Sequence, residues 1–196
     1  RGGGVHGRKL GLEVYDDGYN PAPAIQNTIR LIEKDQAFVL FGYVGAPTVT
    51  RVLPLLKSYS DRSMSLLFPL SGAQPHRQAP YSDQVFNLRA SYWEETEGLV
   101  DNFLSLGRSK IGVFYQMDAY GRSGWDGVRR ALAKNGNLKI VAEATYRHGA
   151  VFDEKFDEQV KLLKSANADA VVSIGTYAAS AAFIRDARET SWQIPI

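Results

Sequence analysis

Short apolar segments alternate with amphipathic segments along the whole chain. Residues 9–16 place Leu10, Leu12 and Val14 at every second position, which is the period of a β-strand. Residues 25–32 instead repeat apolar side chains at helical spacing. By the same criteria, further strands are predicted at 37–42, 65–68, 85–89, 110–115, 139–145 and 170–174. Further helices are predicted at 47–57, from 91 through 104, at 124–135, from 153 and at 178–190.

Several helix ends carry recognisable signals. Asn20 before Pro21 suits an N-cap followed by a first-turn proline. Ser91 and Glu94 form the spacing of a capping box. Asp153 is the predicted cap of the next-to-last helix, and Asn135-Gly136 is a usual C-terminal signal. These signals place the helices between the predicted strands.

Alternation of strands and helices predicts an α/β fold with parallel sheets and helices on both faces. In such sheets ligands bind beyond the carboxyl ends of the strands. The loops at those ends are rich in small residues, hydroxyls and tyrosines. The hydroxyls of Thr48 and Ser71 are candidate donors to a carboxylate, and a following helix N-terminus favours negative charge. The pattern indicates a recognition site for a small, partly apolar acid.

Composition excludes several classes of protein. The 196 residues carry a net charge of +2 and no cysteine, which removes disulfide frameworks, thiol catalysis and cysteine-based metal sites. No Lys/Arg cluster indicates a nucleic-acid surface. No apolar run approaches the roughly 18 residues of a membrane span. We expect neither a metal nor a cofactor, because His6, His76 and His148 lack metal-ligand spacing and are predicted to lie at the surface.

Catalytic alternatives have weaker support. Asp16-Asp17 after a strand would suit a receiver-like acidic site, but a turn pair that helps to cap the next helix is the favoured interpretation. Ser71 lacks the Gly-x-Ser-x-Gly elbow of a serine nucleophile. An enzyme of receiver-like or nucleotide-binding type is therefore the less favoured interpretation, and the chain is predicted not to be an enzyme.

An ordered set of segments then carries a family resemblance. The segments are 3–10, 14–17, Asn20-Pro21, 41–43, 86–89, 118–122 and 170–177. In order and spacing the chain resembles the branched-chain amino-acid-binding proteins, which are type I periplasmic solute-binding proteins of ABC transporters. The resemblance covers nearly the whole chain. It implies two doubly wound parallel-sheet lobes that close on a ligand like a Venus flytrap.

The family pattern also implies site residues. It places Thr48 near the ligand carboxylate, and Ser71, Gly72 and Ala73 in the loop that holds the ligand's carboxylate and amino groups. It places Tyr120 and Tyr177 as aromatic contacts from the second lobe. The leucine/isoleucine/valine binders carry several serines in the first loop, where this chain has Ala46-Pro47-Thr48. That difference leaves aromatic acids open as ligands beside amino acids.

The resemblance further implies that the chain is a fragment. Residues 1–90 would form part of the N-terminal lobe and residues 91–196 part of the C-terminal lobe. A strand and helix are expected before Arg1 and a long return through both lobes after Ile196. In the doubly wound order the earlier strand would lie between residues 9–16 and 37–42. The acidic residue for a ligand's amino group is expected in the absent part.

The expected function is non-catalytic binding of a small carboxylate, such as an amino acid or an aromatic or aliphatic acid, by cleft closure. The expected partner is the membrane permease of an ABC transporter, with no nucleic acid involved. The expected location is the periplasm, or the outer surface with a membrane tether. The alternative is a ligand-sensing domain of a receptor or regulator with the same fold.

Overall fold

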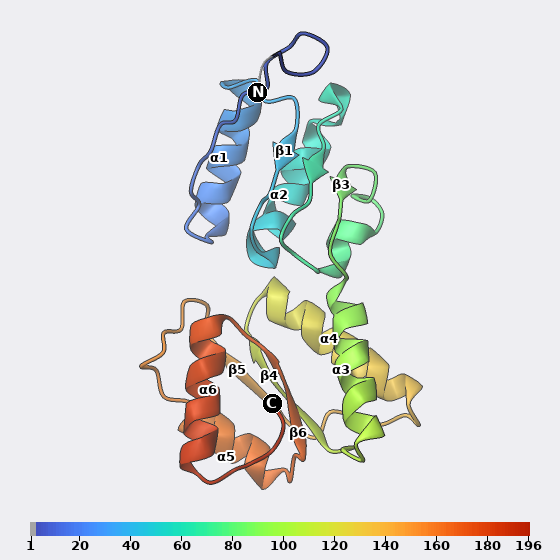
Figure 1. The fold of residues 1–196 in the computed structure, drawn as a ribbon, viewed down its shortest axis with the longest axis vertical. Coiled ribbons are helices and arrows are strands. Elements are labelled where there is room, and N and C mark those ends of the chain that lie inside the picture. Colours follow the sequence, from blue (N-terminus) through green and yellow to red (C-terminus); the bar gives the residue numbers. More distant parts are fainter. Residues whose placement is uncertain (1–2) are drawn as a thin grey trace.

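A computed structural model describes residues 3–196 as two lobes stacked along the long axis of the molecule (Figure 1). The first lobe contains α1 (Pro21–Glu33), β1 (Leu40–Phe41), α2 (Ala46–Ser58), η1 (Ser60–Arg62), β2 (Leu66–Leu67), η2 (Gln74–Arg77) and β3 (Val85–Phe86). The second contains α3 (Tyr92–Ser105), β4 (Ile111–Gln116), α4 (Ala119–Lys134), β5 (Glu143–Tyr146), α5 (Asp157–Ser165), β6 (Ala170–Ile174) and α6 (Tyr177–Glu189). The chain passes from one lobe to the other between β3 and α3.

Each lobe is built on a parallel sheet of three strands. The first sheet has the order β1-β2-β3 and the second the order β5-β4-β6. In the second sheet the chain runs from the central β4 to β5 and then crosses to β6 on the other side. The loops after β4 and β6 therefore diverge at a topological switch point, where open α/β sheets bind ligands. The predicted α/β class with two parallel-sheet lobes is confirmed.

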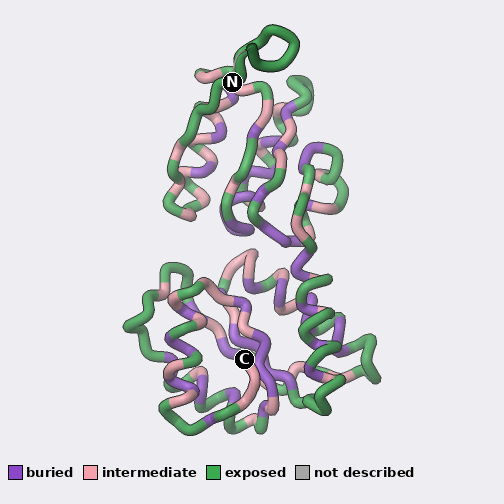
Figure 2. The backbone as a smooth tube through the Cα atoms, viewed as in Figure 1, coloured by how far each residue is buried: buried purple, intermediate pink, exposed green. Residues whose placement is uncertain are grey.

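Apolar layers cover both faces of the second sheet. On one face Phe114 stacks on Phe183 with ring centroids 4.2 Å apart and also contacts Phe156. On the other face Val113 packs with Val128 and Leu132 of α4, so helices lie on both sides. Figure 2 shows the central strands β4 and β6 mostly in the purple of buried residues. The layers fix the positions of the strand ends that carry the site.

The first lobe buries one face of its sheet and exposes the other. Leu40 and Leu66 pack against Leu53 of α2 and are almost fully buried. Phe41 and Phe86, the next residues along β1 and β3, are 63% and 50% exposed. Alternation along a strand places these residues on the opposite face. The helices α1 and α2 therefore cover one side of the sheet.

Residues 9–16 do not form the predicted strand. Leu10, Leu12 and Val14 are 70%, 76% and 74% exposed. Within residues 3–196 no strand pairs with this segment, and cavities of about 620 and 360 Å³ lie between it and the region of β1. A strand needs a hydrogen-bonded neighbour, so the alternating sequence remains extended and unpaired here.

Helix boundaries confirm most of the capping signals. Asn20 caps α1 with Pro21 in the first turn, and Ser91 with Glu94 forms a complete capping box on α3. The prediction for Asp153 was wrong. Helix α5 begins at Asp157, and the N–H of Phe156 donates to Asp186 of α6 instead. Helix α4 begins at Ala119, five residues before the predicted start, because Asp118 caps it.

Within residues 3–196, the helices are too short or too polar to cross a membrane.

Candidate ligand-binding site

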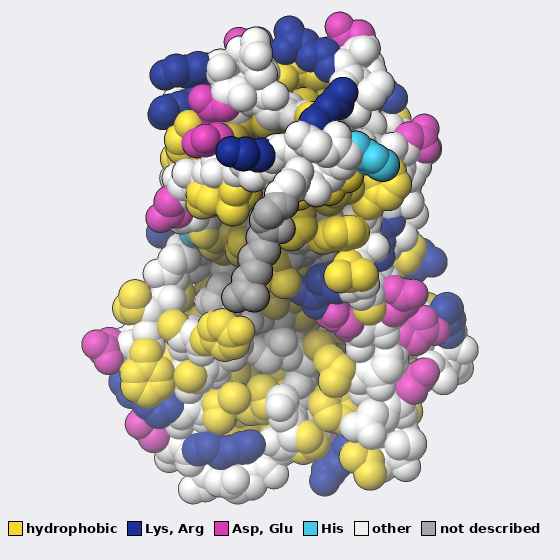
Figure 3. Space-filling model, turned by 45° about the horizontal axis from the view of Figure 1, so that its top comes forward, with side chains coloured by type: hydrophobic (Ala, Val, Ile, Leu, Met, Phe, Trp, Pro, Cys, Tyr) yellow, Lys and Arg dark blue, Asp and Glu magenta, His cyan; other side chains and the backbone are white. Residues whose placement is uncertain are grey.

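A cavity of about 440 Å³ lies between the two lobes. Val44, Gly45 and Leu70 line it from the first lobe, and the loop after β6 lines it from the second. Figure 3 shows hydrophobic side chains of both lobes facing the hollow between them. The volume suits a small molecule, and the lining from two lobes suits a ligand held between them.

Among the helices that begin at this cavity, α2 of the first lobe and α6 of the second have no side-chain cap. Gly45 is the N-cap residue of α2 and Thr176 that of α6, and neither makes a side-chain capping bond. Neither first turn contains an acidic residue. Helix geometry leaves the first amide groups, those of Ala46 and Thr48 in α2 and of Tyr177 in α6, without partners inside their own helices. Two uncapped helix N-termini on opposite walls favour an anion between them.

Tyrosine rings form much of the apolar wall. Tyr19, Tyr92 and Tyr120 line the cavity, and the Tyr92 and Tyr120 ring centroids are 5.2 Å apart. Burial raises the pKa of Tyr19 to about 12 and also raises the pKa of Tyr120, so both hydroxyls are neutral at physiological pH. Tyr177 is 97% exposed at the cavity mouth. Such rings offer flat apolar surfaces with polar tips.

Arg89 and Glu95 contribute charge to the lining. The Arg89 guanidinium pairs with the Glu95 carboxylate and lies 5.1 Å from the Tyr92 ring centroid. The pair neutralises itself, so the helix N-termini supply the positive potential that an incoming anion meets.

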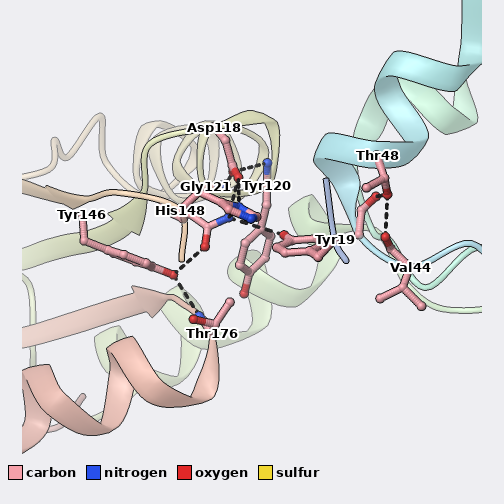
Figure 4. Close-up of polar contacts among 11 residues, drawn as sticks. Tyr19, Val44, Thr48, Asp118, Tyr120, Gly121, Tyr146, His148 and Thr176 are labelled. Carbon is pink, nitrogen blue, oxygen red and sulfur yellow. Dashed lines mark hydrogen bonds and ion pairs between the residues drawn. The ribbon is translucent and has the colours of Figure 1, made fainter. Parts of the chain in front are cut away.

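Of the six residues singled out from the sequence, Tyr120 and Tyr177 line the cavity. Thr48 is fully buried, and its hydroxyl donates to the carbonyls of Val44 and Gly45, 2.8 Å away in the second case (Figure 4). The side chain therefore fixes the start of α2, and Thr48 does not line the cavity.

Ser71, Gly72 and Ala73 lie behind the tyrosine wall. The Ser71 hydroxyl accepts the Ala73 N–H at 3.2 Å, and Ser71 is fully buried. A Cβ on Gly72 would lie 2.7 Å from the ring of Tyr92, so this loop seats that ring. Their roles as ligand contacts stay predictions.

Sequence reasoning missed Tyr19, Tyr92 and the Arg89–Glu95 pair. Tyr19 follows the turn after the first predicted strand, and Arg89 lies within a segment that carries the family resemblance. Position at a strand end was therefore a usable signal for both residues. Tyr92 lies in the first turn of α3, after the predicted cap.

The histidines do not lie together. His76 is fully buried, so the prediction that it lies at the surface was wrong. Its Nε2 lies 3.2 Å from the Thr50 hydroxyl, because the turn η2 packs on α2. His148 lies beside Tyr19 between the lobes. Residues 3–196 contain no group of three histidine or acidic side chains arranged to hold a metal ion.

Two parallel-sheet lobes with a largely apolar cavity between them have the geometry of an interlobe cleft for a small molecule. The sequence model of a family described as "Periplasmic binding protein" matches residues 1–194. The chain belongs to this family. Its members bind solutes without catalysis, in agreement with the predicted absence of enzymatic activity.

Individual proteins show the same similarity. The chain is 24% identical over 194 residues to "Leu/Ile/Val-binding protein homolog 3" of Brucella melitensis, covering 98% of this chain and 50% of that protein. A possible leucine/isoleucine/valine-binding protein from Rhodopirellula baltica superimposes with a TM-score of 0.84 at 28% identity, covering 97% of this chain and 51% of that one. A solute-binding protein from R. palustris in complex with benzoate gives a TM-score of 0.83 at 22% identity, covering 99% and 52%. The chain thus spans about half the length of these relatives.

Proposed function

We propose that the chain is part of the solute-binding component of an ABC transporter and binds a small, partly apolar carboxylate between its lobes. The observation that carries the proposal is the pair of uncapped helix N-termini, α2 and α6, on opposite walls of one tyrosine-lined cavity. A carboxylate between them would accept N–H donors from both lobes. The tyrosine rings would cover the apolar part of the ligand.

Closure follows from this arrangement. A ligand that bridges both lobes binds the closed form more tightly than the open form, and this difference shifts the population towards closure. Tyr177, 97% exposed at the mouth, is the side chain with the most surface to bury. We propose Tyr177 and Tyr120 as ligand contacts. Thr48 supports the start of α2 on the opposite wall, and the Ser71–Ala73 loop supports the ring of Tyr92.

The chemical class of the ligand follows from the lining. Amino acids and simple aliphatic or aromatic acids combine a carboxylate with an apolar body of suitable size. The names of the Brucella and Rhodopirellula relatives point to branched-chain amino acids, and the R. palustris structure contains benzoate. The proposed partner of the closed form is a membrane permease, and the proposed location is the periplasm or the outer cell surface.

A thermal-shift screen against free amino acids and aliphatic and aromatic acids tests the proposal. A ligand at 100 times its dissociation constant adds about 2.7 kcal/mol of stability, a shift of several degrees. Tyr177→Ala should weaken the response at unchanged stability of the free protein, because this side chain is almost fully exposed. Phe38→Ala, which removes an aromatic ring 78% exposed outside the interlobe cavity, is the matched control.

Flat curves for every acid would refute carboxylate binding. Equal loss of response in Tyr177→Ala and Phe38→Ala would refute the assignment of the cavity. The full-length protein distinguishes a sensor from a transporter component. If it binds the same ligand, and the effect of that ligand in cells depends on a signalling module fused to the chain, the sensor is favoured.

A further inference from the structure

Tyr19 is anchored in the first lobe. Its backbone N–H donates to the Asp17 carboxylate at 2.8 Å, and the next residue, Asn20, caps α1. Its ring lies directly on Gly45, where an added Cβ would collide with the Tyr19 ring carbon Cε2. The ring therefore rests on the start of α2.

The same side chain extends to the second lobe. The ring centroids of Tyr19 and His148 are 4.5 Å apart, and the Gln116 amide nitrogen donates to the Tyr19 hydroxyl at 3.4 Å. Figure 4 shows Tyr19 pointing from the α2 side towards Asp118 and His148. Burial at this junction raises the pKa of Tyr19 to about 12, so its hydroxyl is a neutral donor and acceptor.

Gln116 continues the contact into the second lobe. It is fully buried at the end of β4, and its carbonyl oxygen accepts the Tyr146 hydroxyl at 3.1 Å. The Tyr146 oxygen in turn accepts the Thr176 N–H at 2.9 Å, at the N-cap of α6. The side chains of Tyr19, Gln116 and Tyr146 thus connect the start of α2 with the start of α6.

The hydrogen bond between Tyr19 and Gln116, the first of this series, can break and re-form as the two lobes open and close. The Gln116 amide group has two N–H donors but three neighbouring acceptors, which are the Tyr19 hydroxyl, the Asp118 carboxylate and Nδ1 of His148. The bond to Tyr19, at 3.4 Å, is long for a hydrogen bond. If Tyr19 moves away, Asp118 and His148 remain as partners, so the lobes separate without stranding a buried amide.

We propose that Tyr19 is a positioning residue whose bond to Gln116 holds the two lobes, and with them the two helix N-termini at the cavity, in the relative arrangement seen in the structure. The proposal goes beyond ligand binding, because it concerns the free protein. It stands or falls independently of which ligand the cavity takes.

The test is the distance between the lobes in the free protein. The chain has no cysteine, so Lys57→Cys in α2 and Lys161→Cys in α5 allow two spin labels to be attached at exposed sites. Pulsed electron paramagnetic resonance then gives the interlobe distance distribution. Tyr19→Phe keeps the ring on Gly45 and removes only the hydroxyl. It should raise the ratio of longer to shorter distances roughly two- to tenfold, as expected for one net hydrogen bond.

Tyr43→Phe is the matched control, since it removes a hydroxyl that lies 2.7 Å from the Thr28 hydroxyl within the first lobe. It should leave the distribution unchanged. Gln116→Met should reproduce the Tyr19→Phe effect, and the double variant should add little to it. An unchanged distribution in Tyr19→Phe would overturn the proposal, as would an equal change in Tyr43→Phe. If Gln116→Met does not fold, the two tyrosine variants decide alone.

Discussion

The hydroxyl oxygen of Tyr19 lies 3.4 Å from the amide nitrogen of Gln116, although the two residues are 97 positions apart in the sequence. Tyr19 belongs to the turn that leads into α1, and Gln116 ends the central strand of the other sheet. Tyr19 lines the interlobe cavity, and its ring lies on Gly45 at the start of α2. The structure of the site therefore depends on a small residue at position 45, because Gly45 leaves room for the ring of Tyr19.

Gly45→Ala should destabilise the protein by more than about 1 kcal/mol. Gly45 has φ +95°, where a side chain is strained, and its Cβ would overlap the Tyr19 ring. The free energy of unfolding in urea measures the effect. The Gly45→Ala substitution should also broaden the distribution of distances between the lobes.

Gly98→Ala is the matched control for that substitution. Gly98 lies inside α3, with open space where an added Cβ would lie and no left-handed backbone angle. Alanine should stabilise the helix there by about 0.5–1 kcal/mol. Wild-type stability of Gly45→Ala would contradict the observed packing of Tyr19.

His76 should make stability fall as the pH is lowered from 7 to 4. Burial lowers the pKa of His76 to about 4, and the charge of Arg77 adds to this effect. The unfolded chain, with a histidine pKa near 6.5, therefore binds more protons than the folded chain between about pH 6.5 and 4. Stability rises with pH through this window, and the His76 contribution amounts to up to about 3 kcal/mol.

Urea unfolding of wild type and His76→Gln at pH 7, 5.5 and 4 isolates that contribution. The variant should lose less stability on acidification than the wild type does. His6→Gln, which removes an exposed histidine, should follow the wild type. Parallel pH profiles for wild type and His76→Gln would exclude a buried neutral His76.

Asp186→Ala should cost about 2–3 kcal/mol. The carboxylate is fully buried and accepts the Phe156 N–H at 2.6 Å and the Arg185 Nε at 2.8 Å. Burial alone would raise its pKa, but the hydrogen bonds from Arg185, Phe156 and Lys155 outweigh burial and lower it. Stability from this group is therefore present above the unfolded pKa near 4 and is lost as the pH falls below it.

Asp126→Ala is the comparison for Asp186→Ala. Asp126 pairs with Arg129 at 2.7 Å on the surface of α4, a type of pair that contributes about 0.5 kcal/mol or less. Similar unfolding free energies for the two variants would show that the Asp186 bonds add no more than a surface pair does.

Local signals in the sequence predicted much of the fold. The capping box of Ser91 and Glu94, and Asn20 before Pro21, work within one helical turn, so neighbouring residues suffice to identify them. Asp153 has the chemistry of a cap but not the role, because the N–H of Phe156 binds Asp186, which lies 30 residues away in sequence. Residues 9–16 have strand periodicity, but pairing needs a neighbouring strand that periodicity does not supply.

The site was also only partly predictable, because contacts between residues distant in sequence leave no local signal. The family resemblance brought out Tyr120 and Tyr177, which line the cavity. The position of Tyr19 after a predicted strand was a usable signal, but its contacts with Gln116 and His148 could not be predicted, since these partners are distant in sequence. Burial of His76 likewise depends on how η2 packs against α2.

Backbone amide exchange shows whether a bound carboxylate contacts the helix starts of both lobes. The chain is compared free and saturated with the acid that gives the largest thermal shift, and exchange of individual amides is followed by nuclear magnetic resonance. We expect slower exchange at Ala46 and Thr48 in α2 and also at Tyr177 and its neighbours in α6, because one carboxylate would bridge both helix starts. Protection confined to one lobe, or binding that leaves all of these amides unchanged, would contradict an interlobe carboxylate site.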